Sequence, residues 1–417
     1  MKLTLTIGIC LLVLNTAIAQ HTQLPKIPAT SYNVKDYGAL PDGKTLNTQA
    51  IQKALELAKV TGGKVIIPEG TYLCGPLTMY SKTELVLSKN AVLRLSNDIA
   101  TFPVVNARCL NFIDVSKASD IKISGEGTLD GQGLVWWEAT DAGTLKNRRP
   151  QMVYIAGSER IEITGIMFLN PPNTHLSLKD ALEVYIHDIT IKAPANSHNT
   201  DGINISARNC TIDHCTINTG DDNIAINFGN KQQNRQEPEC KNIVVSNCTF
   251  GYGHGLSIGS YTSGSLSNLQ VIKCTFDGTT SAIRIKTARG RGGVLDHISY
   301  TDIDIKNSRW PIFISEYYPR EPKTPQEDTT SQKSAYTPVY RDILLKNITV
   351  SNAQEAIKIW GLPESPIGHI RFENVNISAK TGALIYNADQ VEFDHSSIRV
   401  EKGERLTTYK ANVTGFN

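Results

Sequence analysis

A repeat of apolar residues constrains the fold of this sequence more than any other feature. The spacing i, i+2, i+5, i+7 returns about ten times, mostly at intervals of about 21 to 33 residues. Units begin at Ile161, Val184, Cys210, Ile243, Leu269, Ile298, Ile343, Ile370 and, more weakly, Val391. Apolar residues alternate with other residues on either side of a two-residue corner, which indicates two short strands that share one interior. Repetition at this interval predicts that such coils stack into a parallel β-helix, an all-β solenoid.

Each unit is followed by a third alternating segment, and a helix precedes the coils. The third segments are DGINIS, DNIAIN, GLSIGS, AIRIKT, PIFISE and AIKIWG. Residues 45–63 predict an amphipathic helix whose apolar face covers the N-terminal end of the stack. Because strands follow this helix without a linker, we expect residues 20–417 to form a single β-helix domain rather than two domains. Residues 132–150 and 317–340 are predicted as loop-like insertions.

The N-terminus and the charge balance bear on location and partners. Residues 1–19 combine Lys2, an apolar stretch and an A-x-A site before Gln20, which predicts a signal peptide and a secreted or periplasmic protein. No later segment approaches the roughly 20 apolar residues needed to span a bilayer. The formal net charge of +2 gives no reason to expect a nucleic-acid or membrane partner. We expect a monomer, although the sequence leaves the oligomeric state open.

The cysteines follow the same register as the strands. Seven remain once Cys10 of the signal peptide is set aside, and Cys215, Cys248 and Cys274 occupy the same inward slot in three successive coils. Stacked buried thiols are therefore favoured over disulfides. No CxxC or Cys/His spacing indicates a zinc site, and we expect neither metal nor cofactor.

Three ionisable residues share one position of the repeat. Asp201, Asp222 and His254 each lie two residues before the first inward residue of a third strand, in successive coils. Neighbouring strands are about 4.8 Å apart, so these side chains should be close neighbours. Asp221 is one residue away from this column. Each motif alone also fits a solvated turn or strand, but their coincidence favours a functional site.

In the next coil, Arg284 and Lys286 flank the inward Ile285, so both should point outward beside the acids. Inverting cleavage of a glycosidic bond needs one protonated carboxyl for the leaving oxygen and one ionised carboxylate to activate water. Clustered acids cannot all ionise comfortably, so we expect the Asp221–Asp222 pair to retain a proton. The two cations would then bind an anionic substrate.

The motifs Asn199-Thr200-Asp201, Gly220-Asp221-Asp222, Gly253-His254-Gly255 and Arg284-Ile285-Lys286 resemble, in this order, those of the family 28 glycoside hydrolases, the polygalacturonases. The N-terminal NVKDYGALPDGKTLNTQAIQKAL is also similar to that of pectin-active right-handed β-helix proteins, so the likeness spans nearly the whole chain after residue 19.

The resemblance implies roles for individual residues. Asp221 would be the general acid, Asp201 and Asp222 would activate water, and His254 would tune the protonation of the acid. Substrate would be bound by Asn199, Arg284, Lys286 and Tyr318, with Tyr317 as an alternative to Tyr318. Asn223 departs from the family pattern, which often has a disulfide cysteine there.

The expected activity is metal-independent, inverting hydrolysis of α-1,4-linked galacturonate chains of pectin. Internal and terminal cleavage stay open. The alternatives are a rhamnogalacturonan or xylogalacturonan hydrolase of the same family, and a calcium-dependent pectate lyase on the same fold. The presence of the GHG and RIK motifs favours a homogalacturonan substrate over rhamnogalacturonan. A non-catalytic β-helix binding protein would not need the acids, the histidine and the cations on one face.

Overall fold

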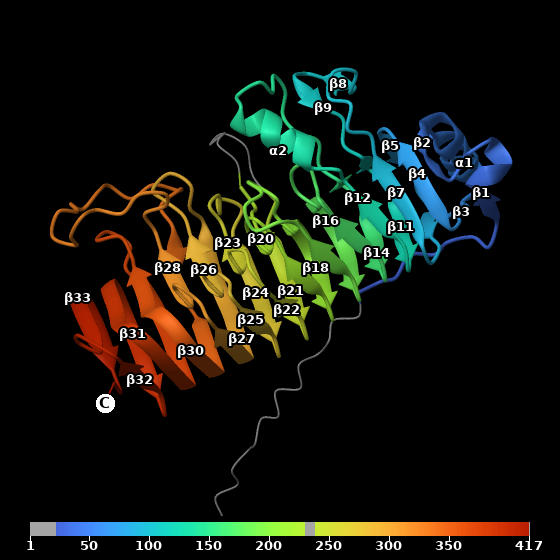
Figure 1. Cartoon of the computed structure of the whole chain (residues 1–417). Coiled ribbons are helices and arrows are strands. Elements are labelled where there is room, and N and C mark those ends of the chain that lie inside the picture. Colours follow the sequence, from blue (N-terminus) through green and yellow to red (C-terminus); the bar gives the residue numbers. More distant parts are fainter. Residues whose placement is uncertain (1–21, 230–237, 417) are drawn as a thin grey trace, which may run out of the picture.

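The computed structural model describes residues 22–229 and 238–416, so the predicted signal peptide lies outside the described residues. These residues form one elongated stack of parallel strands, with α1 at the N-terminal end and β33 at the C-terminal end (Figure 1). The predicted parallel β-helix is confirmed. No helix among the described residues combines the length and the apolar character needed to cross a membrane.

Three parallel sheets run along the stack, and each coil contributes one strand to each sheet. Sheet 1 contains β1 (Ser31–Asn33), β3 (Gly63–Ile67), β6 (Thr83–Leu87), β11 (Ser119–Gly125), β14 (Glu159–Thr164), β21 (Cys240–Ser246) and β24 (Leu266–Ile272). Sheet 2 contains β2 (Asp42–Leu46), β4 (Gly70–Cys74), β7 (Ala91–Leu95), β12 (Thr128–Asp130), β15 (Met167–Leu169), β17 (Thr190–Lys192), β19 (Thr216–Asn218), β22 (Thr249–Phe250), β25 (Thr275–Asp277) and β32 (Ser397–Val400). Sheet 3 contains β5 (Leu77–Met79), β10 (Ile113–Ser116), β13 (Val153–Ala156), β20 (Ile224–Ile226), β23 (Leu256–Ile258), β26 (Ile283–Lys286), β28 (Ile312–Ser315) and β33 (Leu406–Thr414).

Several strands continue through a corner and belong to more than one sheet. These are β16 (Leu176–His187), β18 (Ile203–Asp213), β27 (Val294–Lys306), β30 (Ile343–Trp360), β31 (Ile367–Asp394) and β33. The short β29 (Val339–Tyr340) pairs with the start of β27.

The register confirms the repeat. In sheet 1, Ile161 pairs with Val184, which pairs with Cys210, then Ile243 and Leu269, and all five are buried. Like side chains therefore stack in the core, as Phe250 and Phe276 do with ring centroids 4.5 Å apart. The seven described cysteines are free and buried, which confirms the predicted thiols.

The N-terminal helix α1 (Thr48–Thr61) has the predicted apolar face, because Ile51, Ala54, Leu55 and Ala58 are buried against the first coils. A short 3-10 helix, η1 (Val34–Tyr37), precedes it. Gly62 ends the helix with its amide bonded to the Ala58 carbonyl.

Two groups of insertions project from the stack (Figure 1): one precedes the third strands β10 and β13, and the other follows the end of the third strand β28. One combines the hairpin β8 (Val104–Val105) and β9 (Arg108–Cys109) with helix α2 (Leu134–Asp141). The other is the segment between β28 and β29, which lacks regular structure as predicted. Residues 132–150, predicted as loop-like, instead contain α2. Trp136 and Trp137 are buried on this short helix, and the Trp137 indole donates to the Pro171 carbonyl at 3.0 Å.

Candidate active site

Three neighbouring strands of sheet 3 bring the predicted acids and histidine together. Ile203 of β18 pairs with Ile224 of β20, which pairs with Leu256 of β23. Asp201, Asp222 and His254 each precede these residues by two positions, so the predicted column exists. In Figure 1 the site lies between α2 and the segment that follows β28.

Asp222 is buried and occupies the centre of a charge network. Its Oδ2 accepts from Lys286 Nζ at 2.9 Å, and its Oδ1 accepts from Arg284 at 3.0 Å and from the Ser257 hydroxyl at 2.7 Å. Burial alone would raise the pKa of this carboxyl, but Lys286, His254 and Arg284 hold its pKa well below the usual range. Asp222 is therefore ionised under ordinary conditions.

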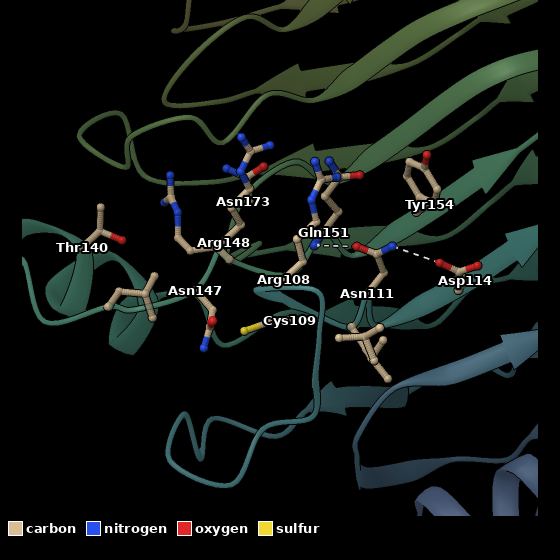
Figure 2. Close-up of a pocket in the computed structure, with 14 residues that line it drawn as sticks. Arg108, Cys109, Asn111, Asp114, Thr140, Asn147, Arg148, Gln151, Tyr154 and Asn173 are labelled. Carbon is tan, nitrogen blue, oxygen red and sulfur yellow. Dashed lines mark hydrogen bonds between the residues drawn. The ribbon is translucent and has the colours of Figure 1, made fainter.

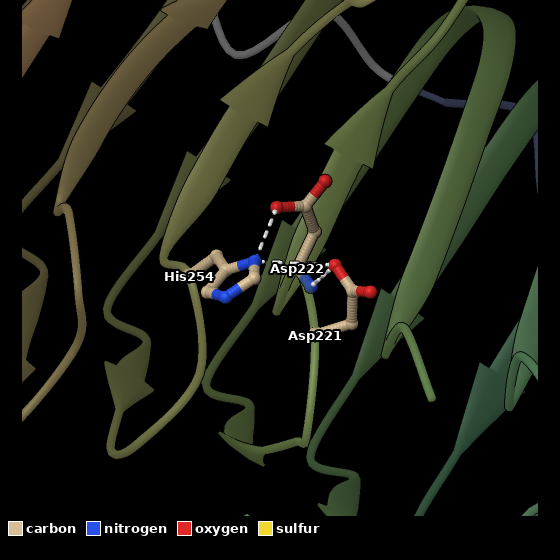
Figure 3. Close-up of side chains that lie close together, drawn as sticks. All are labelled: Asp221, Asp222 and His254. Atoms are coloured by element: carbon tan, nitrogen blue, oxygen red, sulfur yellow. Dashed lines mark hydrogen bonds and ion pairs between the residues drawn. The ribbon is translucent and has the colours of Figure 1, made fainter. Parts of the chain in front are cut away.

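Asp221 and His254 lie beside Asp222 (Figure 3) and are less buried than it. His254 Nδ1 lies 3.2 Å from Asp221 Oδ1 and 3.5 Å from Asp222 Oδ1, at ion-pair distance but without hydrogen-bond alignment to either. The Asn199 amide donates to Asp221 Oδ2 at 3.1 Å. Burial would raise the pKa of Asp221, but His254 outweighs it and the pKa falls below its usual value. The carboxylates in turn raise the pKa of His254 to about 9.

Asp201 behaves differently from the other two acids. Burial raises its pKa to about 8, with further contributions from the negative charges of Asp221 and Asp222. The repulsion predicted for the Asp221–Asp222 pair is thus relieved by cations from the following coils, and the proton is favoured on Asp201. The cluster therefore holds one protonated carboxyl, Asp201, beside two ionised ones, and protonated His254 is a second proton donor next to Asp221.

Backbone features explain how His254 reaches the acids. Gly253 and Gly255 have φ of +127° and +73°, and a Cβ on Gly255 would lie 1.8 Å from the Ser281 carbonyl. Only glycine fits such positions without strain. The amide of buried Asn223 donates to the Ile217 and Tyr252 carbonyls, and its oxygen accepts from the Gly255 amide at 2.7 Å. Asn223 therefore ties the two coils together by hydrogen bonds.

The two tyrosines named as alternatives differ in their contacts. The Tyr318 ring lies beside Lys286, whose Nζ is 5.2 Å from the ring centroid. Tyr317 is buried, packs on Trp360 and bonds through its hydroxyl to Asp328. Asp328 also pairs with Arg289 at 3.0 Å, so Tyr317 and Arg289 anchor the segment after β28, and Tyr318 faces the site.

Two residues of the site were missed in the sequence. Ser257, the hydroxyl partner of Asp222, occupies an outward position of β23, and the strand register could have identified it. Arg149 donates to the His198 carbonyl at 2.9 Å and to Asn199 Oδ1 at 3.3 Å. Its charge acts on Asp201 and Asp221, but it comes from the insertion that contains α2, where no repeat predicts the path of the chain.

Asp221, Asp222 and His254 offer ligand atoms within 4.8 Å of one another, so a cation site must be considered. Calcium takes six to eight oxygen ligands. Here both oxygens of Asp222 accept from cationic side chains, and the raised pKa of His254 favours its protonated form. These charges oppose a divalent cation, and the donor set does not fit calcium.

Comparisons with known proteins show the family of this chain. The family model described as glycosyl hydrolases family 28 matches residues 59–396. An endo-polygalacturonase of Pectobacterium carotovorum subsp. carotovorum is 30% identical over 416 residues, covering 92% of this chain and 96% of the relative. A probable polygalacturonase of Vitis vinifera is 31% identical over 388 residues, covering 87% of this chain and 78% of the relative.

Among solved structures, the polygalacturonase from Erwinia carotovora ssp. carotovora has a TM-score of 0.69 at 27% identity, covering 94% of this chain and 98% of its own. An exopolygalacturonase from Thermotoga maritima has a TM-score of 0.72 at 23% identity, over 93% of this chain and 94% of its own, and shows the shared fold. The motifs, the β-helix and the family match agree, and this chain belongs to glycoside hydrolase family 28.

Proposed function

We propose that this glycoside hydrolase is a polygalacturonase that cleaves α-1,4 linkages between galacturonate units with inversion. The observation that carries the proposal is the network around Asp222, in which an ionised carboxylate, two further acids and His254 meet Lys286 and Arg284. The relatives named as polygalacturonases, and the order of the four motifs, support the same substrate.

The acids divide between proton donation and activation of water. Asp222 stays ionised and supplies the base. Asp221 is more exposed, with 23% of its side chain accessible against 7% for Asp222, and Nδ1 of His254 lies 3.2 Å from Asp221 Oδ1. We assign Asp221 as the acid that protonates the leaving oxygen, as the family resemblance implies. Because its pKa is below the usual value, Asp221 is ionised in the free protein, and protonated His254 supplies the proton that Asp221 passes to the leaving oxygen. Asp201 holds a proton in the free protein and has to release it before it can join Asp222 in activating water.

Arg284, Lys286 and Tyr318 form the substrate side of the site. A uronate carboxylate would share the two cations with Asp222, and the Tyr318 ring beside Lys286 offers an apolar face to the sugar. Asn199, held by Arg149 and bonded to Asp221, would position the leaving group.

The alternatives are less well supported. A calcium-dependent lyase would need oxygen ligands that Asp222 cannot offer while its cations are in place. An endo-xylogalacturonan hydrolase from Aspergillus tubingensis shares the fold with a TM-score of 0.72, but at 20% identity it does not argue for its substrate. A non-catalytic binding protein would gain nothing from placing Asp201 where its ionised form is disfavoured.

Residues 1–19 support export to the periplasm or the medium, and we propose that the enzyme acts there as a monomer. Expression of the full chain followed by fractionation and N-terminal sequencing would test export. An N-terminus at Gln20 is expected, and an intact N-terminus in the cytoplasm would contradict it.

The deciding experiment incubates the enzyme with polygalacturonic acid, with and without EDTA, and follows reducing ends and unsaturated uronate. Reducing ends alone, unaffected by EDTA and lost in Asp221→Asn, are expected. Unsaturated product that disappears with EDTA would mean a lyase. Product lengths would separate internal from terminal cleavage, and NMR of the first product would show its anomeric form.

A further inference from the structure

A second concavity lies on the N-terminal side of the acids (Figure 2). It has a volume of about 700 Å³ and is formed by the β8–β9 hairpin, the segment after α2 and the outer face of sheet 3. This volume is within the range typical of pockets for small organic ligands. Its lining includes Arg108, Arg148, Arg149, Asn111, Gln151 and Tyr154.

This pocket is aligned with the acids by the strand register. Ile113, Val153, Leu176 and Ile203 pair in succession across sheet 3. The residues two positions earlier are Asn111, Gln151, Thr174 and Asp201, so two amides of the pocket occupy the same column as the acids. Gln151 and Asp201 are two coils apart, or about 10 Å. A polysaccharide chain bound along this column would therefore extend from the acids into the pocket.

The pocket carries unbalanced positive charge. Arg108 and Arg148 are exposed, and among the described residues neither has a carboxylate within ion-pair distance. The one acid of the lining, Asp114, accepts from Asn111 at 3.0 Å and from Ser116 at 2.9 Å. Arg108 and Arg148 therefore face one carboxylate in the lining, whereas the charge of Arg149 also acts on Asp201 and Asp221. By contrast, Arg284 and Lys286 in the active site already contact Asp222.

Arg149 connects this pocket with the active site. It lines the pocket, and its guanidinium donates to His198 and to Asn199, which in turn bonds to Asp221. The pocket and the acids are thus parts of one continuous polar surface.

We propose that this arginine pocket binds the carboxylates of further uronate units of the chain being cleaved, and so selects unesterified stretches; the proposal rests on the proposed function. Arginine pairs with carboxylates through two parallel hydrogen bonds, which a methyl ester cannot match. The amides of Asn111 and Gln151 suit sugar hydroxyls, and Gln151 Oε1 is buried without a hydrogen-bond partner. A neutral polysaccharide would leave the arginines without a counter-charge.

The test compares Arg108→Gln, Arg148→Gln and the double variant with the parent enzyme on digalacturonate, trigalacturonate, hexagalacturonate and polygalacturonate. Arg149 is left intact because it contacts Asn199. The double variant should lower kcat/KM on the polymer by about tenfold, equivalent to about 1.4 kcal/mol, with a loss that grows with chain length. Lysine at both positions should restore part of the activity. Lys146→Gln removes an exposed charge from the same segment outside the lining and serves as the matched control.

If the double variant lost the same factor in kcat/KM on short and long substrates, or lost none on the polymer, the proposal would be overturned. Partly methyl-esterified polygalacturonate gives a second readout, because the preference of the parent enzyme for the unesterified polymer should shrink in the double variant. An unchanged preference would count against the pocket.

Failure of the proposed function can be told apart from failure of the pocket. If the parent enzyme released no reducing ends from polygalacturonate, the proposed function would be wrong. Calorimetric titration of hexagalacturonate would then still test the pocket: binding by the parent that is lost in the double variant supports it, and equal binding by both refutes it.

Discussion

Replacing Asp201 with asparagine should abolish activity and make the protein more stable at neutral pH. The pKa of Asp201 is raised to about 8 from a usual value of 3.8. A carboxyl whose pKa is raised by folding contributes fully at low pH and loses that contribution as pH rises from about 4 to about 8. Asparagine resembles the protonated carboxyl and does not ionise, so the variant should not lose stability over that window.

The size of the stabilisation expected for Asp201→Asn follows from the pKa shift of Asp201. Each pKa unit corresponds to about 1.36 kcal/mol, so the roughly three units between the usual pKa and pH 7 give an upper limit of about 4 kcal/mol. Asp201 is partly exposed, so solvent reduces the cost of its charge, and we expect about 2 kcal/mol. For a chain of this size that corresponds to a rise in Tm of about 2 °C.

Urea unfolding at pH 4, 6 and 8, followed by circular dichroism, would measure the effect. The midpoint difference between Asp201→Asn and the parent should be small at pH 4 and grow towards pH 8. Asp222→Asn is the matched control with the opposite sign. It leaves Arg284 and Lys286 without their carboxylate, which should cost about 3 kcal/mol or more at neutral pH. The deficit in stability of Asp222→Asn should change little between pH 4 and pH 8 and shrink only in more acidic solution, because the pKa of Asp222 is held well below its usual value. An Asp201→Asn variant that is less stable than the parent at pH 8, or whose midpoint difference does not change with pH, would refute the reasoning.

Three further substitutions probe the surroundings of the acids. His254→Gln removes the contact that lowers the pKa of Asp221, so kcat should fall and the alkaline limb of the remaining activity should move to higher pH; an unmoved limb in the pH–rate profile would exclude this coupling. Lys286→Met should lower kcat/KM on polygalacturonate about a hundredfold, because Asp222 loses its partner at 2.9 Å and substrate loses a cation; kinetics equal to the parent would remove Lys286 from the site. Arg289→Met breaks its pairs with Asp328 and Glu364, so trypsin should cut the segment after β28 faster, and an unchanged rate would contradict its anchoring role.

The register of the coils was predictable because only one alignment of the repeats places all of their apolar residues inside the core. Ile203, Ile224 and Leu256 pair as expected, and this alone placed Asp201, Asp222 and His254 in one column. A one-residue slip would turn every inward residue outward, so the core enforces the alignment of the site.

The location of the proton was not predictable from the acids alone. Two adjacent aspartates suggest repulsion, but Asp222 contacts Arg284 and Lys286 of β26, two coils further along the stack, and the local sequence does not show these distances. Helix α2 and Arg149 were missed for a related reason. They lie in an insertion without repeat, whose path depends on contacts such as the bond from Trp137 to the Pro171 carbonyl.

The β-helix separates the residues that stabilise the stack from those that perform chemistry. Inward positions hold aliphatic, aromatic and thiol ladders, whereas the outward column changes from Asn111 and Gln151 to the acids and then to Ser281 and Trp310. Each coil contacts its neighbours, so the stability of a solenoid is close to a sum of local terms. The cost of burying Asp201 among other carboxylates therefore falls on a few coils, while the others hold the stack together. The same additivity allows insertions such as the β8–β9 hairpin to shape one end of the groove without disturbing the acids.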